Sequence, residues 1–297
     1  MPLSIPPPRW LDRLDCAQMT FVLTLVEKVD LPALALLQLR REFSSLLMTL
    51  EEQSGIQVAR LVNDLLFPPP ALDPVVQRQV QKPPAAVIFS PDAVTPGGFA
   101  GGHQFKLPTL FVGDGVVAIE AFILLLELLG QRGIYKGQGR FDVAGDCFPP
   151  TIVPLSWLLN RQPTSFNQVK LEIVTPMRLL NKGKPLFRFD FNNFFHALQR
   201  RLNHLAIAHG DAVTDNDNDR YEQSATIVCD DESLHWQDWR QLEQGRKRQG
   251  IGGLTGSLTL SGDALAEVWW LLELGSLLHV GKGASYGFGR FRLLQCA

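Results

Sequence analysis

The chain has 297 residues, of which 45% are apolar and 20% charged, and its formal net charge is −2. This composition is typical of a globular protein and excludes an intrinsically disordered chain. The longest uncharged apolar run, Ala121–Leu126, is far too short to cross a membrane. The four cysteines form no CxxC pair, which is typical of a reducing compartment. We therefore expect a cytoplasmic protein without a membrane partner. The near-neutral charge neither indicates nor excludes a nucleic-acid partner.

The first half of the chain contains two long helical patterns separated and flanked by strand patterns. The segment Gln18–Val26 is apolar and rich in β-formers, which predicts a strand. Apolar residues recur at helical spacing from Leu31-Pro32 to Leu50, which predicts a helix. A region broken by prolines follows. The next elements are expected to be two strands, a helix and a strand, at Ala85–Ser90, Gln104–Val112, Val117–Leu129 and Arg140–Val143.

The second half repeats this order. The expected elements are a strand, a helix, two strands, a helix and a strand, at Gln168–Val174, Phe191–Ala208, Thr226–Val228, Leu254–Leu260, Ala264–Leu278 and Arg290–Leu294. Each half therefore has the order β-α-β-β-α-β, which is the ferredoxin-like arrangement. The pattern predicts an α+β fold with two tandem ferredoxin-like domains, at residues 1–155 and 156–297. Prolines are concentrated near the expected boundary, between residues 149 and 163.

A glycine-rich loop closes the second half and has a smaller counterpart in the first. The segment Leu274–Phe291 places Gly281, Gly283, Gly287 and Gly289 within nine residues. Five residues of the first half precede their counterparts by 150 positions, Gly133, Gly137, Gly139, Arg140 and Phe141 matching Gly283, Gly287, Gly289, Arg290 and Phe291. Two interpretations remain open: backbone N–H groups that bind phosphate, or glycines that let loop and helix pack closely.

The second half resembles a known family in residues and in their order. The matching segments are Val174–Leu180 (VTPMRLL), Phe194–Leu205 (FFHALQRRLNHL), Gly252–Gly256 (GGLTG) and Leu277–Phe291 (LLHVGKGASYGFGRF). They resemble the CRISPR repeat-RNA processing endoribonucleases of the RAMP superfamily of RNA-binding proteins. The first half matches more loosely, through Leu39–Arg41 and Tyr135–Phe141.

The resemblance implies an endoribonuclease that cuts CRISPR precursor RNA without a metal or cofactor. The 2′-hydroxyl attacks the adjacent phosphate, leaving a 2′,3′-cyclic phosphate and a 5′-hydroxyl. The implied partners are CRISPR repeat RNA, its crRNA product and other CRISPR effector subunits. The chemistry requires a base, an acid and positive charge at the phosphate. The sequence does not indicate an oligomeric state, the RNA sequence or the position of the cut.

Four residues are candidates for the chemical step. The family usually supplies a histidine on or just after the first helix, but residues 33–80 contain no histidine, tyrosine or lysine. His279 and Lys282 at the end of the last helix, with Tyr286 nearby, are the first candidates, because histidine titrates near neutral pH. His103, which follows the segment PGGFAGG, is the other. The alternatives are a structural histidine at a helix C-terminus for His279 and a solvated loop residue for His103.

Cationic and glycine residues are the candidates for RNA binding. Arg246, Lys247 and Arg248 form a basic turn that can bind phosphates, although a solvated charged turn remains the alternative. The other candidates are Arg40, Arg41, Gly281, Gly283 and Arg290. Arg290 can instead support its own glycine loop.

Two further functions compete with RNA cleavage. One is a non-cleaving RAMP relative that holds repeat RNA in a CRISPR effector complex. The other is a nucleotide site in a small-molecule enzyme. The chain has no G-x-x-x-x-G-K-[ST] motif, and the G-x-G at Gly281–Gly283 follows a helix where a dinucleotide site requires a strand. No metal site is expected.

Overall fold

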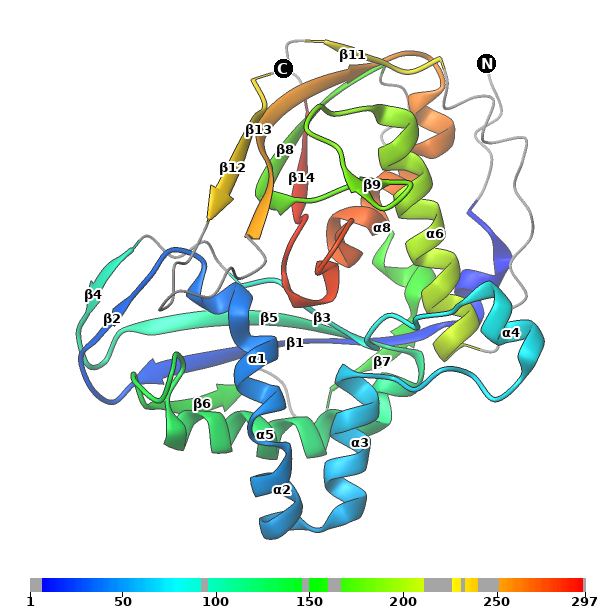
Figure 1. Cartoon of the computed structure of the whole chain (residues 1–297). Helices are drawn as coiled ribbons and strands as arrows, with labels where there is room; N and C mark the ends of the chain where they lie inside the picture. Colours follow the sequence, from blue (N-terminus) through cyan, green and yellow to red (C-terminus); the bar gives the residue numbers. More distant parts are fainter. Residues whose placement is uncertain are drawn as a thin grey trace.

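A computed structural model describes residues 7–91, 96–145, 150–159, 167–210, 226–230, 233–239 and 251–295. Two antiparallel sheets dominate the fold (Figure 1). The first has the order β3-β5-β1-β6, with β7 paired to the start of β1. Its strands are β1 Asp15–Leu25, β3 Val87–Phe89, β5 Gln104–Val112, β6 Phe141–Gly145 and β7 Ile152–Pro154.

The second sheet has the order β11-β13-β8-β14, with β12 paired to the start of β13. Its strands are β8 Gln168–Met177, β11 Val228–Asp230, β12 His235–Trp239, β13 Ile251–Ser261 and β14 Phe291–Gln295. In both sheets the first and third strands of the half lie in the centre, with the second and fourth at the edges. This is the ferredoxin-like topology, so the predicted α+β fold with two such units is confirmed.

Three long helices lie where the sequence predicts them. They are α5 Ile119–Arg132, α6 Phe191–His209 and α8 Leu265–Leu278. The start of α6 is fixed by Asp190, whose carboxylate accepts a hydrogen bond of 3.2 Å from the backbone N–H of Asn193. Its apolar stripe, which includes Phe194, Phe195 and Leu198, is buried.

The single helix predicted after residue 31 is wrong. The chain forms a 3-10 turn, Ala35–Gln38, and two short helices, α1 Leu39–Ser44 and α2 Leu47–Ser54. The hydroxyl of Ser45 donates to the Glu42 carbonyl at 2.6 Å, which competes with continuation of the helix. Gly55, at φ 89°, ends α2.

The proline-rich region also contains helices that the sequence does not predict. They are α3 Ile56–Leu66, whose apolar face is buried, and α4 Pro74–Gln79. Several short strands, β7 among them, are likewise unpredicted. β2 Val29–Leu31 pairs with β4 Gly97–Phe99, which lies in the segment PGGFAGG before His103. β12 pairs with β13, and β9 Leu180–Asn181 pairs with β10 Lys184–Pro185.

The two sheets do not have separate cores. The hydrophobic cluster around the second sheet includes buried residues of the first half, namely Trp10, Leu11, Leu14, Cys16, Ile88, Leu110 and Val112. Conversely, Tyr286 of the second half packs into the cluster around the first sheet. The predicted boundary between residues 155 and 156 falls between the two sets of strands and remains a prediction. No helix in the described part of the chain has the length and apolarity needed to span a bilayer.

The internal glycine repeat has a backbone counterpart. Gly137 and Gly287 have φ of 77° and 91°, and Gly139 and Gly289 have φ of 71° and 66°. A side chain on Gly289 would fall on the Val280 carbonyl oxygen. All four positions therefore favour glycine for their conformation, and Gly289 needs it for close approach as well.

Candidate functional site

The glycine loop between α8 and β14 reaches from the second half to the first. Figure 1 shows it descending toward β3 and β5, and its short 3-10 turn, Ala284–Tyr286, contacts β3. Thr175 fixes the C-terminal part of the loop, because its hydroxyl donates to the Gly287 carbonyl at 2.6 Å and accepts from the Arg290 N–H at 2.9 Å. The loop is thus part of the contact between the halves.

His279, predicted to be a catalytic acid, is fully buried at the end of α8. Its Nε2 lies 3.0 Å from the Ser90 hydroxyl of the first half, and its Nδ1 lies 3.2 Å from the Ala284 carbonyl. Burial lowers the pKa of His279 to about 3, with smaller contributions from the charges of Arg201 and Arg290. The neutral ring therefore joins the loop to Ser90. Its catalytic role remains a prediction.

Tyr286 is also buried in this contact. Its hydroxyl donates a hydrogen bond of 2.6 Å to the Leu66 carbonyl at the end of α3. Burial raises the pKa of Tyr286 to about 12, although the nearby Arg40 acts in the opposite direction. The phenol therefore stays protonated at neutral pH.

A cavity of about 390 Å³ lies beside the loop, between the two halves. Its described charged residues are Arg40, Lys82 and Arg201, and its described lining contains no acidic residue. Gly281 and Gly283 also line it. Within the described part of the chain, their N–H groups bond no carbonyl oxygen. Positive charge and backbone N–H groups together favour an anion.

Arg40 projects from α1 between two aromatic rings. Its guanidinium carbon lies 5.1 Å from the centroids of both Phe67 and Tyr286. Cation–π contacts of this kind hold the planar guanidinium in one orientation while leaving its N–H groups available. Arg41, the neighbouring candidate, is exposed and does not line this cavity.

Arg201 forms the opposite wall, from the middle of α6. Its Nε donates to the Leu278 carbonyl at 2.7 Å, and its Nη2 donates to the Ser285 hydroxyl at 3.2 Å. Burial lowers the pKa of Arg201 to about 10, so the group stays charged at neutral pH. These two bonds use two of the five guanidinium N–H donors, and the side chain both caps α8 and lines the cavity.

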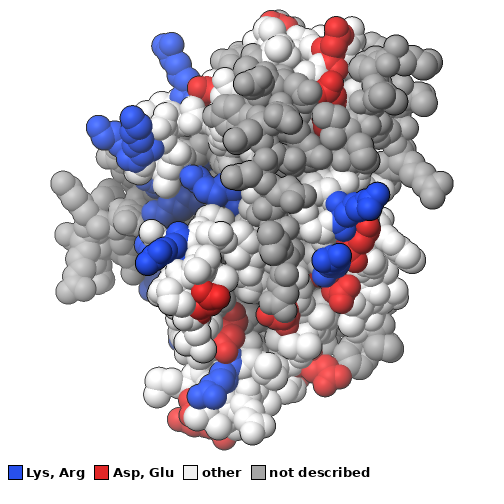
Figure 2. Space-filling view, turned by 90° about the vertical axis from the view of Figure 1, so that its right-hand side faces the viewer, with Lys and Arg blue, Asp and Glu red and all other residues white. Residues whose placement is uncertain are grey.

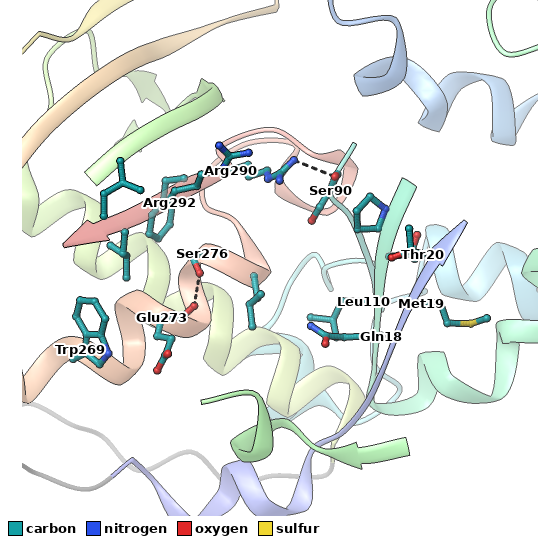
Figure 3. A pocket seen from close by; sticks show the side chains of 16 residues that line it. Gln18, Met19, Thr20, Ser90, Leu110, Trp269, Glu273, Ser276, Arg290 and Arg292 are labelled. Carbon is teal, nitrogen blue, oxygen red and sulfur yellow. Dashed lines mark hydrogen bonds between the residues drawn. The ribbon is translucent and has the colours of Figure 1, made fainter. Parts of the chain in front are cut away.

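A second cavity between the halves, of about 630 Å³, differs in charge. It combines Arg290 and Arg292 with Glu273 (Figure 3). Arg292 lies 4.0 Å from Glu172. Arg290 donates to the carbonyls of Ser90 and Pro91 at 3.1 and 3.0 Å, so it also joins the halves.

A third cavity, of about 590 Å³ between α3 and the end of α6, is acidic. Its described charged residues are Asp64, Asp73 and Asp114.

Viewed from the right of Figure 1, the surface carries Lys and Arg side chains gathered on its upper left part (Figure 2). Among the three cavities, only the one beside the glycine loop combines an exclusively cationic described lining with open N–H groups.

The remaining predicted residues are not brought together. Lys282 is exposed on the loop. His103 lies directly before β5, with its ring centroid 4.8 Å from that of Phe99 and 4.7 Å from that of Phe105, and it lines none of the three cavities. Arg246, Lys247 and Arg248 lie outside the described residues. Among the residues that are described, no group of three His, Cys, Asp or Glu side chains is placed to hold a metal ion.

Sequence reasoning missed Ser90, Lys82, Arg201 and Thr175. Ser90 and Lys82 lie in the first half and approach the loop only through the contact between the halves. Arg201 and Thr175 fall inside the segments that carry the family resemblance, which was the signal available. Nothing in a single helical pattern distinguishes the inward Arg201 from the neighbouring Arg200.

Residues 171–291 match the model of a family described as CRISPR-associated endoribonuclease Cas6. This part of the chain is similar to the Cas6 family. It contains most of β8, all of α6, β13 and α8, the glycine loop and the start of β14. All four second-half segments that carry the resemblance lie within it. No curated protein matches the sequence.

Solved Cas6 structures share the fold over almost the whole chain. The product complex of Cas6 TTHB231, a protein of Thermus thermophilus, has a TM-score of 0.55 at 15% identity and covers 93% of this chain and 100% of its own. The product complex of Cas6 TTHA0078 has a TM-score of 0.53 at 17% identity, with 95% and 100% covered. A partial Cas6-RT-Cas1–Cas2 complex has a TM-score of 0.55 at 13% identity, covering 94% of this chain and 46% of that one.

Proposed function

We propose that this protein binds CRISPR repeat RNA and cleaves the precursor transcript without a metal. The observation that carries the proposal is the cationic cavity beside the glycine loop, between Arg40, Lys82 and Arg201. Its lining matches what a phosphodiester requires, namely positive charge and N–H donors without a competing carboxylate. The Cas6 family match over residues 171–291 supports RNA as the source of that phosphate.

In the proposed reaction the 2′-oxygen bonds to phosphorus as its proton leaves, and the bond from phosphorus to the 5′ oxygen breaks as that oxygen gains a proton. The products are a 2′,3′-cyclic phosphate and a 5′-hydroxyl. We assign the stabilisation of the phosphorane charge to Arg40, Lys82 and Arg201. We assign a positioning role to His279, because its buried, neutral ring holds the loop against Ser90.

The EDTA cleavage assay tests this function. Purified protein is incubated with a transcript of the CRISPR repeat from the source genome, in EDTA, and the 3′ ends of the products are analysed. Cleavage that leaves a 2′,3′-cyclic phosphate is expected. Tight binding with intact RNA would instead establish a non-cleaving RNA-binding subunit of an effector complex.

One observation supports this second function, a non-cleaving RNA-binding subunit. The described lining of the cationic cavity contains no histidine, and the phenol of Tyr286 is engaged with the Leu66 carbonyl. A site of this kind can hold a phosphate without an efficient base. The same assay therefore decides between the two functions.

A further inference from the structure

An aromatic pair with one exposed ring lies on the second half, outside the lining of the cationic cavity. Phe187 follows the β9–β10 hairpin, and 63% of its surface is exposed. Its ring packs on the indole of Trp236 in β12, with centroids 4.5 Å apart and planes inclined by 55°. Two elements far apart in sequence thus meet to present one ring to solvent.

The ring beneath Phe187 is held in place from below. Trp236 lies opposite Leu254 in the β12–β13 register and packs against the hydrophobic core. A Cβ on Gly252 would lie 3.0 Å from Cζ2 of the indole, so the missing side chain lets the ring lie against the strand. On the other side, the Leu186 N–H donates to the Leu179 carbonyl at 3.0 Å, which fixes the segment that carries Phe187.

The surroundings of Phe187 are basic. Lys182, Lys184 and Arg188 are all exposed within five residues of it along the chain. The acidic residue of this segment, Asp190, is engaged as the cap of α6, accepting hydrogen bonds from the backbone and side-chain nitrogens of Asn193. A single exposed apolar ring needs no explanation. A rigidly supported ring among cations matches the sites at which proteins stack unpaired bases and contact the flanking phosphates.

We propose that Phe187, supported by Trp236, stacks against an unpaired nucleobase of bound RNA, while Lys184 and Arg188 contact the adjacent phosphates. This inference rests on the proposed function and adds a second RNA contact to it. Stacking of this kind tolerates any base, since every base has a π face. The site therefore contributes affinity for single-stranded RNA in addition to the contacts made in the cationic cavity, and it contributes little sequence preference.

Two 12-nucleotide probes separate stacking from charge. One is fluorescein-labelled oligouridylate, and the other is an abasic ribose-phosphate strand of the same length. Fluorescence anisotropy is measured for the wild type, Phe187→Ala and Phe187→Trp. Trp157→Ala is the matched control, because Trp157 is 73% exposed and its neighbour Ser156 bonds the acidic Asp12 at 2.6 Å.

We expect Phe187→Ala to weaken oligouridylate binding by about 5-fold to 150-fold, the loss of one stacked base, and to leave the abasic probe unchanged. Phe187→Trp should retain wild-type binding, and Trp157→Ala should have no effect. Equal loss for both probes, unchanged oligouridylate binding by Phe187→Ala, or failure of Phe187→Trp to restore binding would overturn the inference.

Failure of the stacking proposal can be distinguished from failure of the proposed function. A wild-type protein that cleaves repeat RNA but binds the two 12-nucleotide probes equally, or binds neither, refutes only the stacking site. A wild-type protein that neither binds nor cleaves repeat RNA refutes the proposed function itself.

Discussion

Replacement of His279 by glutamine gives a stability change whose size depends on pH. Glutamine retains a polar side chain of similar reach and does not titrate. At pH 7.5 the variant should lose the packing of a fully buried ring and leave the Ala284 carbonyl without its partner. Together these effects cost about 2–4 kcal/mol of the free energy of unfolding.

The wild-type histidine has its own pH dependence. Its pKa is about 3 in the folded protein and about 6.5 in the unfolded chain. Because the folded pKa is the lower one, the unfolded chain takes up the proton first, and stability present above pH 6.5 is lost as the pH falls toward 3. At pH 4.5, two units below 6.5, the wild type has therefore lost about 2.7 kcal/mol of its free energy of unfolding, at about 1.36 kcal/mol per pH unit.

The assay is urea unfolding of wild type and His279→Gln at pH 7.5, 6.0 and 4.5, followed by tryptophan fluorescence. The carboxylates and other histidines titrate in both proteins, so the difference between the two isolates His279. The difference in the free energy of unfolding between wild type and His279→Gln should shrink from a few kcal/mol at pH 7.5 to nearly zero at pH 4.5. A difference that does not change with pH would refute the conclusion that the His279 ring is buried and neutral. Unchanged stability combined with about a 100-fold loss of cleavage would refute the positioning role and support the predicted catalytic one.

Two further predictions concern the cavity and the loop. Arg40→Ala and Lys82→Ala should each weaken binding of repeat RNA and lower the slope of log K against log salt by about 1, whereas Arg60→Ala, at an exposed position outside the cavity, should leave the slope unchanged. Filter binding at four salt concentrations measures the slopes. Equal slopes for the wild type and the two cavity variants would place the RNA elsewhere. Gly289→Ala should destabilise the fold by more than about 3 kcal/mol, whereas Gly102→Ala, which also has a positive φ but open space around the added Cβ, should cost about 1–2 kcal/mol. Thermal denaturation checks the pair, and equal losses would mean that strain alone matters at Gly289.

The sequence predicted a helix or strand correctly where the whole pattern lies within that one element. β5 and α6 were predicted almost residue by residue, since alternation and helical spacing are local properties. The helix after residue 31 was not, because its interruption depends on the Ser45 hydroxyl and on the turn before it. β12 was missed since it lies at a sheet edge next to a bulge, where pairing with β13 decides the structure.

The candidate site was predicted less well for a related reason. The glycine loop and Arg40 were identified from sequence, and both line the cationic cavity. Lys82 and Arg201 join them only through tertiary contact between the halves, which no periodicity records. His279 was selected for its intrinsic pKa near neutrality, whereas its environment, set by burial and two nearby arginines, moves that pKa far from neutrality.

The shared core limits how this chain can be divided. Side chains of residues 10–16 belong to the core around the second sheet, and the ring of Tyr286 belongs to the core around the first. A fragment comprising either half alone would expose these apolar surfaces and leave the partners of Ser90 and Arg290 unpaired. We therefore expect the halves to behave as complementing fragments and not as autonomous modules. Severing the backbone between the sheets would leave them associated, and heating would melt them together.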